Sequence, residues 1–293
     1  MIELVAHHFS YDRSEGRVDR AFKKFCLKGK TAFITGGGTG LGYYMARGLM
    51  LSGARVMIAA RREAVLKKAV ARLTAEVSEG AISYALIDLG DSASIVEAAQ
   101  QAVNQLGGVD IFVGNAGNEG KAFVHEDQVI LADVMQVNFS ANVMLLKYFV
   151  PRMQEKKWGR ILFSSSETSI RGLASGRSIY AASKGALNSY ARMAAIELGH
   201  DGITVNSLII GFFLTEMLQT RAVEHSGEDE SASAGVAQKH ADNTAVGRIG
   251  NPAEIEGLVQ LLASEAGSFI TGSELLIDGG TSIMMRPNPI NKF

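Results

Sequence analysis

A glycine-rich turn between a strand and a helix constrains the fold of this chain more than any other feature. The apolar run from Thr31 to Ile34 predicts a short buried strand, which leads into Thr35-Gly-Gly-Gly-Thr-Gly-Leu-Gly42 and then into a helical stretch that Gly53 can end. Glycines let the backbone turn sharply and approach a pyrophosphate, while the helix N-terminus offers free N–H groups to the negative charge. The turn therefore predicts a nucleotide-binding unit.

The rest of the chain alternates strand and helix patterns. Short apolar runs predict further strands at residues 54–60, 82–87, 109–113, 159–163, 202–210 and 274–278. The stretches between them predict helices at 63–77, 92–106, 126–150, 179–198 and 252–264. The last of these helices opens with the capping box Asn251-Pro-Ala-Glu254. We expect Pro151 to end the helix that precedes it. This alternation indicates an α/β protein.

Composition excludes several classes of function. The chain has 293 residues, 47% of them hydrophobic, which suffices for the core of one large domain. A formal net charge of -1 gives no basic field for nucleic acid. The single cysteine, Cys26, allows no internal disulfide, and no pattern in the sequence resembles a metal cluster. The sequence has no membrane-spanning apolar run and no signal-peptide pattern. We expect a soluble, cytoplasmic protein with a small-molecule substrate, no metal, and no nucleic-acid or membrane partner.

The ends and one internal segment differ in composition from the remainder. Residues 1–28 carry many charges and predict an N-terminal extension, residues 29–283 form the expected domain, and residues 284–293 predict an irregular C-terminal tail. Residues from about 212 to 247 are rich in Glu, Ser, Ala and His, a composition that predicts a mobile lid over the substrate. We expect His225 and His240 to be solvated surface residues rather than ligands.

Three strand ends carry residues suited to a dinucleotide. Ala60 stands where an acidic residue would bind ribose hydroxyls, and Arg61 follows it with a charge that suits a 2′-phosphate. This arrangement favours NADP(H), with NAD(H) as the alternative. Asp88 can accept a hydrogen bond from an adenine amine, or it can cap the turn before the next helix. The small residues of Asn115-Ala-Gly117 let a cofactor lie close to the backbone.

Tyr180 and Lys184 are the leading catalytic candidates. A spacing of four in the expected helix at 179–198 places them on one face, about one turn apart. A fixed ammonium favours the phenolate, so the tyrosine can exchange a proton with a carbonyl oxygen near neutral pH. Ser164-Ser165-Ser166 add hydroxyls at a strand's carboxyl end, where parallel sheets bind ligands. Taken alone, such a pair also occurs by chance on surface helices, and Asn138 among apolar neighbours also fits a satisfied core amide.

The order of these motifs resembles the classical short-chain dehydrogenase/reductase family from about residue 28 to 283. The resemblance rests on Thr35-Gly-Gly-Gly-Thr-Gly-Leu-Gly42, Asp88, Asn115-Ala-Gly117, Asn138, Ser166, Tyr180-Ala-Ala-Ser-Lys184, Gly211 to Thr215 and Asp278-Gly-Gly280. It implies a single Rossmann-type domain, a doubly wound sheet of seven parallel strands with helices on both faces, assembled as a homotetramer or homodimer.

The resemblance also implies roles for individual residues. Tyr180 would be the acid/base, Lys184 would lower its pKa and bind ribose, Ser166 would orient the carbonyl, and Asn138 would hold a water in a proton relay. The implied cofactor contacts are Gly36, Thr39, Gly40, Leu41 and Gly42 at the pyrophosphate, Arg61 at the 2′-phosphate, Asp88 and Leu89 at the adenine, and Asn115, Ala116, Gly117, Tyr180, Lys184, Gly211, Phe213 and Thr215 elsewhere.

Three positions depart from the family pattern. Ile210-Gly211 stands where Pro-Gly is usual, so the loop into the lid is expected to be less rigid. Ser166 lies fourteen residues before Tyr180, one more than in many members, so Ser165 remains an alternative. Thr39 stands where NADP-preferring members often carry a basic residue, which weakens the preference for NADP(H) without reversing it.

These residues predict an NADP(H)-dependent oxidoreductase that moves a hydride between nicotinamide and a secondary alcohol or ketone, with Tyr180 as acid/base. An enoyl-thioester reductase acting on 2-enoyl- or dienoyl-CoA is the alternative enzyme, because Phe33 to Gly42 looks like dienoyl-CoA reductases. A non-catalytic nucleotide-binding sensor is the alternative from another class. Residues 173–177 and the lid would line the substrate pocket, which leaves sugars or polyols, oxoacyl thioesters, steroids and other ketones open.

Overall fold

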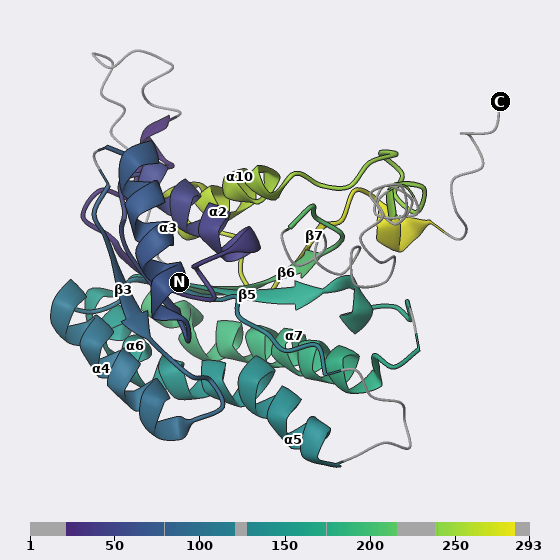
Figure 1. Cartoon of the computed structure of the whole chain (residues 1–293). Helices are drawn as coiled ribbons and strands as arrows, with labels where there is room; N and C mark the ends of the chain where they lie inside the picture. Colours follow the sequence, from purple (N-terminus) through teal and green to yellow (C-terminus); the bar gives the residue numbers. More distant parts are fainter. Residues whose placement is uncertain are drawn as a thin grey trace, which may run out of the picture.

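Seven parallel strands form one sheet in the order β3-β2-β1-β4-β5-β6-β7 (Figure 1). The computed structural model describes residues 22–78, 80–120, 128–173, 175–215, 238 and 240–284. The strands are β1 (Thr31–Thr35), β2 (Arg55–Ala60), β3 (Ile82–Leu86), β4 (Ile111–Gly114), β5 (Gly159–Ser166), β6 (Ile203–Ile210) and β7 (Glu274–Ile277). The predicted Rossmann-type sheet of seven parallel strands is therefore confirmed.

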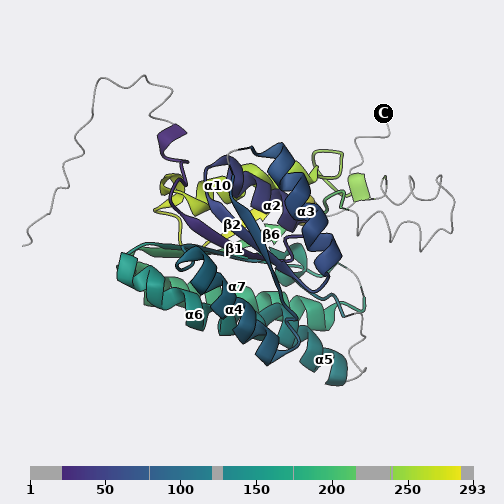
Figure 2. The same cartoon turned by 60° about the vertical axis from the view of Figure 1, so that its left-hand side comes forward.

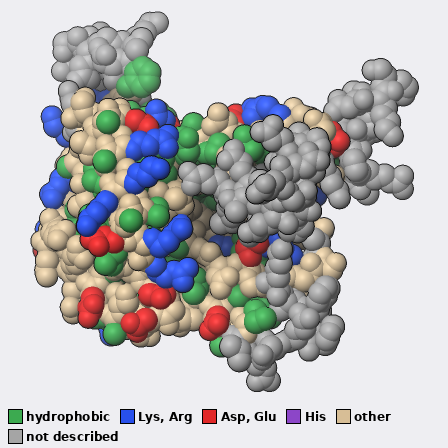
Figure 3. All heavy atoms as spheres, in the orientation of Figure 1, with side chains coloured by type: hydrophobic (Ala, Val, Ile, Leu, Met, Phe, Trp, Pro, Cys, Tyr) green, Lys and Arg blue, Asp and Glu red, His purple; other side chains and the backbone are tan. Residues whose placement is uncertain are grey.

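Helices cover both faces of this sheet (Figures 1 and 2). One face carries α2 (Gly40–Leu51), α3 (Glu63–Glu76) and α10 (Ile255–Ala263), and the other carries α4 (Ser92–Leu106), α5 (Gln128–Met135), α6 (Ala141–Lys156) and α7 (Ser178–Leu198). A π-helical turn, Gln136–Ser140, joins α5 to α6. Short 3-10 turns lie at Glu167–Ser169, Gly199–Asp201, Pro252–Glu254, Glu265–Gly267 and Thr281–Ile283. Figure 3 shows one face of the molecule, on which Lys and Arg side chains lie among Asp and Glu side chains.

Alternation along each strand divides the core between the two faces. Buried hydrophobic side chains form one cluster on each face of the sheet. In β1, Phe33 belongs to the cluster beneath α4, α6 and α7, and the next residue, Ile34, belongs to the cluster beneath α2, α3 and α10. Phe33, Phe112 and Phe149 are fully buried, and their ring centroids lie 5.3 to 6.5 Å apart. Burying each such side chain stabilises the fold by about 1.5–3 kcal/mol. The central strands are thus held rigidly at the point where the site is built.

Most predicted boundaries agree with the structure to within one or two residues, but the helix predicted at 126–150 does not end at Pro151. Helix α6 continues to Lys156, and Lys157 ends it in the left-handed region at φ 51°. Pro151 lies on the exposed side of α6, where water can satisfy the carbonyl that loses its intrahelical partner. The predicted domain ends with a 3-10 turn, Thr281–Ile283, directly before the predicted tail.

Several predictions lie outside the described residues. Residues 1–21, 216–237, 239 and 285–293 belong to the extension, the lid and the tail, and His225 is among them. In the ranges that the structure covers, no helix combines the length and the hydropathy needed to cross a membrane. The same ranges contain no group of three or more His, Cys, Asp or Glu side chains that could hold a metal ion.

The strand order places a crevice next to β1. The chain winds outward from β1 to β2 and β3, then crosses to β4 on the other side of β1. Ligands of doubly wound sheets bind where the winding reverses, beyond the carboxyl ends of the strands. The glycine turn after β1 and the Asn115-Ala-Gly117 segment after β4 meet at this point.

Candidate active site

Two adjoining cavities open at the carboxyl edge of the sheet. The larger, of about 650 Å³, contains many of the predicted residues, and the smaller, of about 280 Å³, lies beside β2, β3 and β4. The larger cavity is lined by Gly36, Thr39, Gly40, Leu41, Gly42, Arg61, Asn115, Ala116, Gly117, Ser166, Tyr180, Lys184, Gly211, Phe213 and Thr215. Asp88 and Leu89 line the smaller one, together with Arg61. Asn138 lines neither.

The turn after β1 is closed by contacts that only glycine permits. Gly36 and Gly40 adopt φ values of +69° and +53°, a region that side chains other than glycine rarely enter. A Cβ atom on Gly42 would lie 2.2 Å from the carbonyl oxygen of Gly36. The hydroxyl of Thr35 accepts hydrogen bonds from the backbone N–H groups of Asn115 and Ala116, at 3.0 and 3.1 Å. The ends of β1 and β4 therefore form one rigid cradle against which a pyrophosphate fits.

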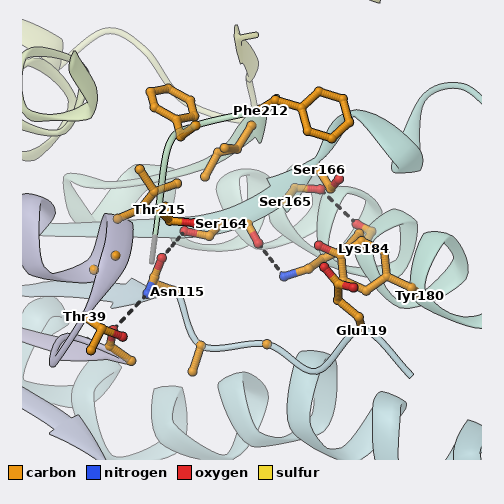
Figure 4. Close-up of a pocket in the computed structure, with 18 of the residues that line it drawn as sticks. Thr39, Asn115, Glu119, Ser164, Ser165, Ser166, Tyr180, Lys184, Phe212 and Thr215 are labelled. Carbon is orange, nitrogen blue, oxygen red and sulfur yellow. Dashed lines mark hydrogen bonds between the residues drawn. The ribbon is translucent and has the colours of Figure 1, made fainter. Parts of the chain in front are cut away.

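A chain of polar contacts continues from this cradle toward the catalytic candidates (Figure 4). The amide nitrogen of Asn115 donates to the carbonyl oxygen of Thr35 at 3.1 Å, and its amide oxygen accepts from the hydroxyl of Ser164 at 3.2 Å. The ammonium of Lys184 donates to the carbonyl oxygen of Ser164 at 2.7 Å. The orientation of Lys184 is thus fixed by the last residues of β5.

Tyr180 and Lys184 come together as their spacing predicts. The Lys184 nitrogen lies 5.7 Å from the centroid of the Tyr180 ring, and both side chains line the larger cavity. Lys184 is 3% exposed, and burial lowers the pKa of its ammonium to about 8. A lysine with such a pKa is still mostly charged near pH 7. It can therefore act on the neighbouring phenol through its positive charge.

The three serines of β5 have different surroundings. The hydroxyl of Ser165 is buried and donates to the carbonyl oxygen of Lys184 at 3.3 Å. Ser166 is only partly buried, and its hydroxyl accepts from the backbone N–H and the hydroxyl of Thr168. An oxygen that accepts these two bonds keeps its own hydrogen for a further acceptor. The geometry therefore favours Ser166 over Ser165 as the hydroxyl that faces a substrate.

Asn138 lies beneath the cavity in the π-helical turn and is fully buried. Its amide oxygen accepts from the backbone N–H of Asn118 at 2.6 Å, and its amide nitrogen donates to the carbonyl oxygen of Asn118 and to the hydroxyl of Ser183. Its own backbone carbonyl accepts from the amide of Asn142 at 2.8 Å. The side chain is thus a satisfied core amide that holds the segment after β4, and π-turns of this kind are frequent at functional sites.

The predicted cofactor residues at the ends of β2 and β3 surround the smaller cavity. Arg61 is exposed and borders both cavities, as expected for a group that meets a phosphate. The carboxylate of Asp88 accepts from the backbone N–H of Gly90 at 2.9 Å, while Asp91 is the residue that caps α4. Asp88 therefore shapes the turn and lines the cavity at once, so the two interpretations of this residue are compatible.

Several residues of the cavity wall lie outside the predicted catalytic and cofactor-binding sets. Glu119 and Arg177 form an ion pair there, and the carboxylate of Glu167, 2% exposed, pairs with Arg171 at 2.7 Å. Burial raises the pKa of Glu167 above its ordinary value. His240 also lines the cavity and packs on Phe212, with the ring centroids 4.1 Å apart, so its assignment to solvated surface was wrong. Residues 173–177 and the lid from about 212 to 247 were predicted to line the pocket, and they include Arg177, Phe212 and His240. Glu119 and Glu167 were missed, because their pairings join distant segments.

The comparisons with known proteins show the family of this chain. The family model for short chain dehydrogenases matches residues 30–225, and the chain belongs to this family of oxidoreductases, which act on CH–OH and C=O groups. A curated relative, the 3-oxoacyl-(acyl-carrier-protein) reductase of Vibrio cholerae, is 33% identical over 87% of this chain and 98% of its own length.

Two solved structures extend the similarity to the fold. L-sorbose reductase of Gluconobacter frateurii, solved with NADPH and L-sorbose, has a TM-score of 0.85 and 25% identity over 89% of this chain and 100% of its own. A 3-oxoacyl (acyl-carrier-protein) reductase of Agrobacterium tumefaciens with NADP bound has a TM-score of 0.81 and 29% identity over 90% of this chain and 98% of its own.

Proposed function

We propose that this protein reduces a ketone to a secondary alcohol, or catalyses the reverse reaction, with NADP(H) and with Tyr180 as the acid/base. The observation that carries the proposal is the buried Lys184 ammonium 5.7 Å from the Tyr180 ring, at the wall of a cavity that the glycine turn also lines. A tyrosine beside a fixed cation is suited to proton exchange with a carbonyl oxygen near neutral pH.

NADP(H) would lie along the cradle from the smaller cavity to Tyr180. The N-terminus of α2 and Gly36 to Gly42 would hold the pyrophosphate, Arg61 the 2′-phosphate, and Asp88 and Leu89 the adenine. When bound, the cofactor supplies or accepts the hydride. The related structures solved with NADPH and NADP support NADP(H) as the preferred cofactor, and the exposed guanidinium of Arg61 agrees with them.

The protein's own residues would handle the proton and orient the substrate. The Tyr180 hydroxyl gives its proton to the carbonyl oxygen during reduction and takes it back during oxidation. The Lys184 charge favours the phenolate, and the Ser166 hydroxyl donates a hydrogen bond to the same carbonyl oxygen. The side chain of Asn138 is occupied by Asn118 and Ser183, so a role of this residue in a proton relay would fall to its backbone carbonyl.

Further expectations belong to the same proposal. Residues from about 212 to 247 would cover the substrate, and Phe212, Phe213 and Thr215 at the start of that segment line the cavity. Residues 1–28 would form an extension and residues 284–293 a tail outside the domain. We also propose a cytoplasmic location and a homotetramer or homodimer as the assembly.

The decisive experiment compares NADPH and NADH oxidation against ketones, keto-sugars, 3-oxoacyl thioesters and 2-enoyl thioesters, with Tyr180→Phe as the control. We expect a ketone to be reduced faster with NADPH, and we expect Tyr180→Phe to lose turnover at least about 100-fold while it still binds NADPH. Reduction of an enoyl thioester alone would favour the alternative enzyme. Cofactor binding with no turnover of any substrate would favour the sensor.

A further inference from the structure

An ion pair outside the predicted catalytic set lies on the wall of the larger cavity. Glu119 comes from the segment after β4, Arg177 comes from the N-terminus of α7, and a guanidinium nitrogen of Arg177 contacts a carboxylate oxygen of Glu119. Their side chains are 26% and 24% exposed, and both residues line the cavity beside Tyr180. Figure 4 shows Glu119 and Tyr180 on the same side of the cavity. Atoms of both charged groups therefore remain accessible to a ligand.

The backbone fixes both partners relative to the catalytic candidates. Arg177 is the N-cap residue of α7, and its carbonyl oxygen accepts from the N–H of Ala181 at 2.8 Å, one residue after Tyr180. Glu119 follows Asn118, which is bound at its N–H and its carbonyl oxygen by the side chain of Asn138. The pair thus stands on two anchored segments at a fixed position from the reacting hydroxyl, which is what a specificity-determining contact requires.

The two carboxylates at this end of the cavity, Glu119 and Glu167, already have cationic partners. Glu119 pairs with Arg177, and the buried Glu167 pairs with Arg171. A charged substrate group would have to compete with one of these pairs. A hydroxyl can instead donate to the carboxylate and accept from the guanidinium without breaking the pair, and such charge-assisted hydrogen bonds are among the stronger ones.

Leu173 and Phe212, whose ring packs on His240, add apolar surface to the same cavity. Figure 4 shows Phe212 across the cavity from Glu119. A carbon skeleton with hydroxyl groups on one side and C–H groups on the other matches this division. A long unbranched acyl chain would leave the Glu119–Arg177 pair without hydrogen-bonding partners in the ligand.

We propose that the Glu119–Arg177 pair selects neutral, hydroxyl-rich ketones and alcohols, such as keto-sugars and polyols, over apolar ketones and oxoacyl thioesters. The inference rests on the ketone reduction proposed above and specifies its substrate class. Sites that hydrogen-bond a substrate hydroxyl reject analogues without it strongly, because the polar groups of the site are then desolvated without partners.

The test uses the purified full chain with NADPH and measures kcat and KM for L-sorbose, D-fructose, 2-octanone and acetoacetyl-CoA. The variants are Glu119→Gln and Arg177→Met, which remove one charge each. The control is Arg152→Met, which breaks an ion pair of the same two residue types, Arg152 with Glu155, on the surface of α6. NADPH affinity and 2-octanone reduction report whether each variant is folded and holds its cofactor.

We expect wild-type protein to prefer one of the ketoses. Each cavity variant should lose about 10- to 100-fold in kcat/KM for that ketose, mainly through KM, while 2-octanone changes by less than about 3-fold. The Arg152 control should change none of these values. A purely structural role of the pair would instead lower kcat/KM for all substrates alike, and that result would overturn the inference.

Failure of the inference and failure of the proposed function look different. Wild-type protein that reduces 2-octanone or acetoacetyl-CoA faster than either ketose refutes the role of the ion pair and leaves ketone reduction standing. Ketose kinetics that stay unchanged in both Glu119→Gln and Arg177→Met also refute the role of the ion pair and leave ketone reduction standing. Protein that binds NADPH but reduces none of the four compounds refutes the proposed ketone reduction, and the substrate class falls with it.

Discussion

Replacing Lys184 by Met should make the stability of this protein less dependent on pH while abolishing its turnover. Lys184 is fully buried, and burial lowers its pKa from 10.5 to about 8. The folded-state pKa lies below the unfolded one, so the unfolded chain binds more protons between these two values. The cost of burying the ammonium is therefore fully present below pH 8 and is relieved as the pH rises toward 10.5.

The magnitude follows from the same two pKa values. At about 1.4 kcal/mol per tenfold change in the equilibrium constant, the full cost is about 3 kcal/mol near neutral pH. About 2 kcal/mol of it is relieved between about pH 7 and pH 9.5. The packing of the buried side chain adds a contribution that does not depend on pH, while the hydrogen bond from Lys184 to the carbonyl oxygen of Ser164 is strongest when the amine is charged. The difference between variant and wild type thus separates into a constant part and a part that varies with pH.

The assay is urea unfolding of the protein without cofactor at pH 7, 8, 9 and 9.5, followed by circular dichroism. The free energy of unfolding of wild type, relative to that of Lys184→Met, should rise by about 2 kcal/mol across this range. Lys68→Met, on the exposed side of α3, is the matched control, and its difference from wild type should stay the same at every pH. A difference between Lys184→Met and wild type that stays constant with pH would show that burial does not set the protonation of this lysine.

Three further predictions concern the glycine turn, the phosphate contact and a helix cap. Gly42→Ala places a methyl group 2.2 Å from the carbonyl oxygen of Gly36, so the NADPH Kd should rise at least about 10-fold in a fluorescence titration, and an unchanged Kd would contradict the cradle. Arg61→Ser should weaken NADPH binding about 10- to 100-fold and leave NADH within about 3-fold, and equal losses would argue against a 2′-phosphate contact. Hydrogen bonds from Arg248 and from the Asn251 backbone lower the pKa of Glu254 from 4.5 to about 2. These bonds therefore stabilise the folded protein fully above pH 4.5, and this stabilisation is lost as the pH falls toward 2. Because the carboxylate is exposed, Glu254→Gln should lower the free energy of unfolding, measured with urea, by less than about 1 kcal/mol at pH 7 and by still less at pH 3. An equal loss at both pH values would show that these hydrogen bonds do not depend on the charge of Glu254.

Much of the fold could be predicted because its signals are local. Helix α4 runs from Ser92 to Leu106 as predicted, since the Asp91 side chain caps its first turn and Gly107 ends it at φ +73°. Pro151 misled the prediction for a physical reason. The local sequence does not show that its helix presents this position to solvent, where a missing hydrogen bond is tolerated.

The site was predictable where its residues share one motif and not where they meet across the chain. Tyr180 and Lys184 are one helical turn apart, so their proximity follows from the helix. Arg177 and Glu119 are separated by 58 positions, and neither is surrounded by a pattern that indicates the other. The contact between Phe212 and His240 likewise depends on how the chain returns after β6.

Buried charges lie at both edges of the sheet. At the amino edge, the Asp110 carboxylate accepts from the backbone and the hydroxyl of Thr31 and from the ammonium of Lys156, and burial lowers the pKa of the Arg160 guanidinium. At the carboxyl edge, the buried Lys184 has a lowered pKa with burial as its cause. A glycine turn with positive φ and a π-turn lie at the same edge. Natural sequences keep such locally unfavourable features where function requires them. At the carboxyl edge, a buried ammonium, a glycine turn and a π-turn therefore lie together beside the cavity that Tyr180 and Lys184 line.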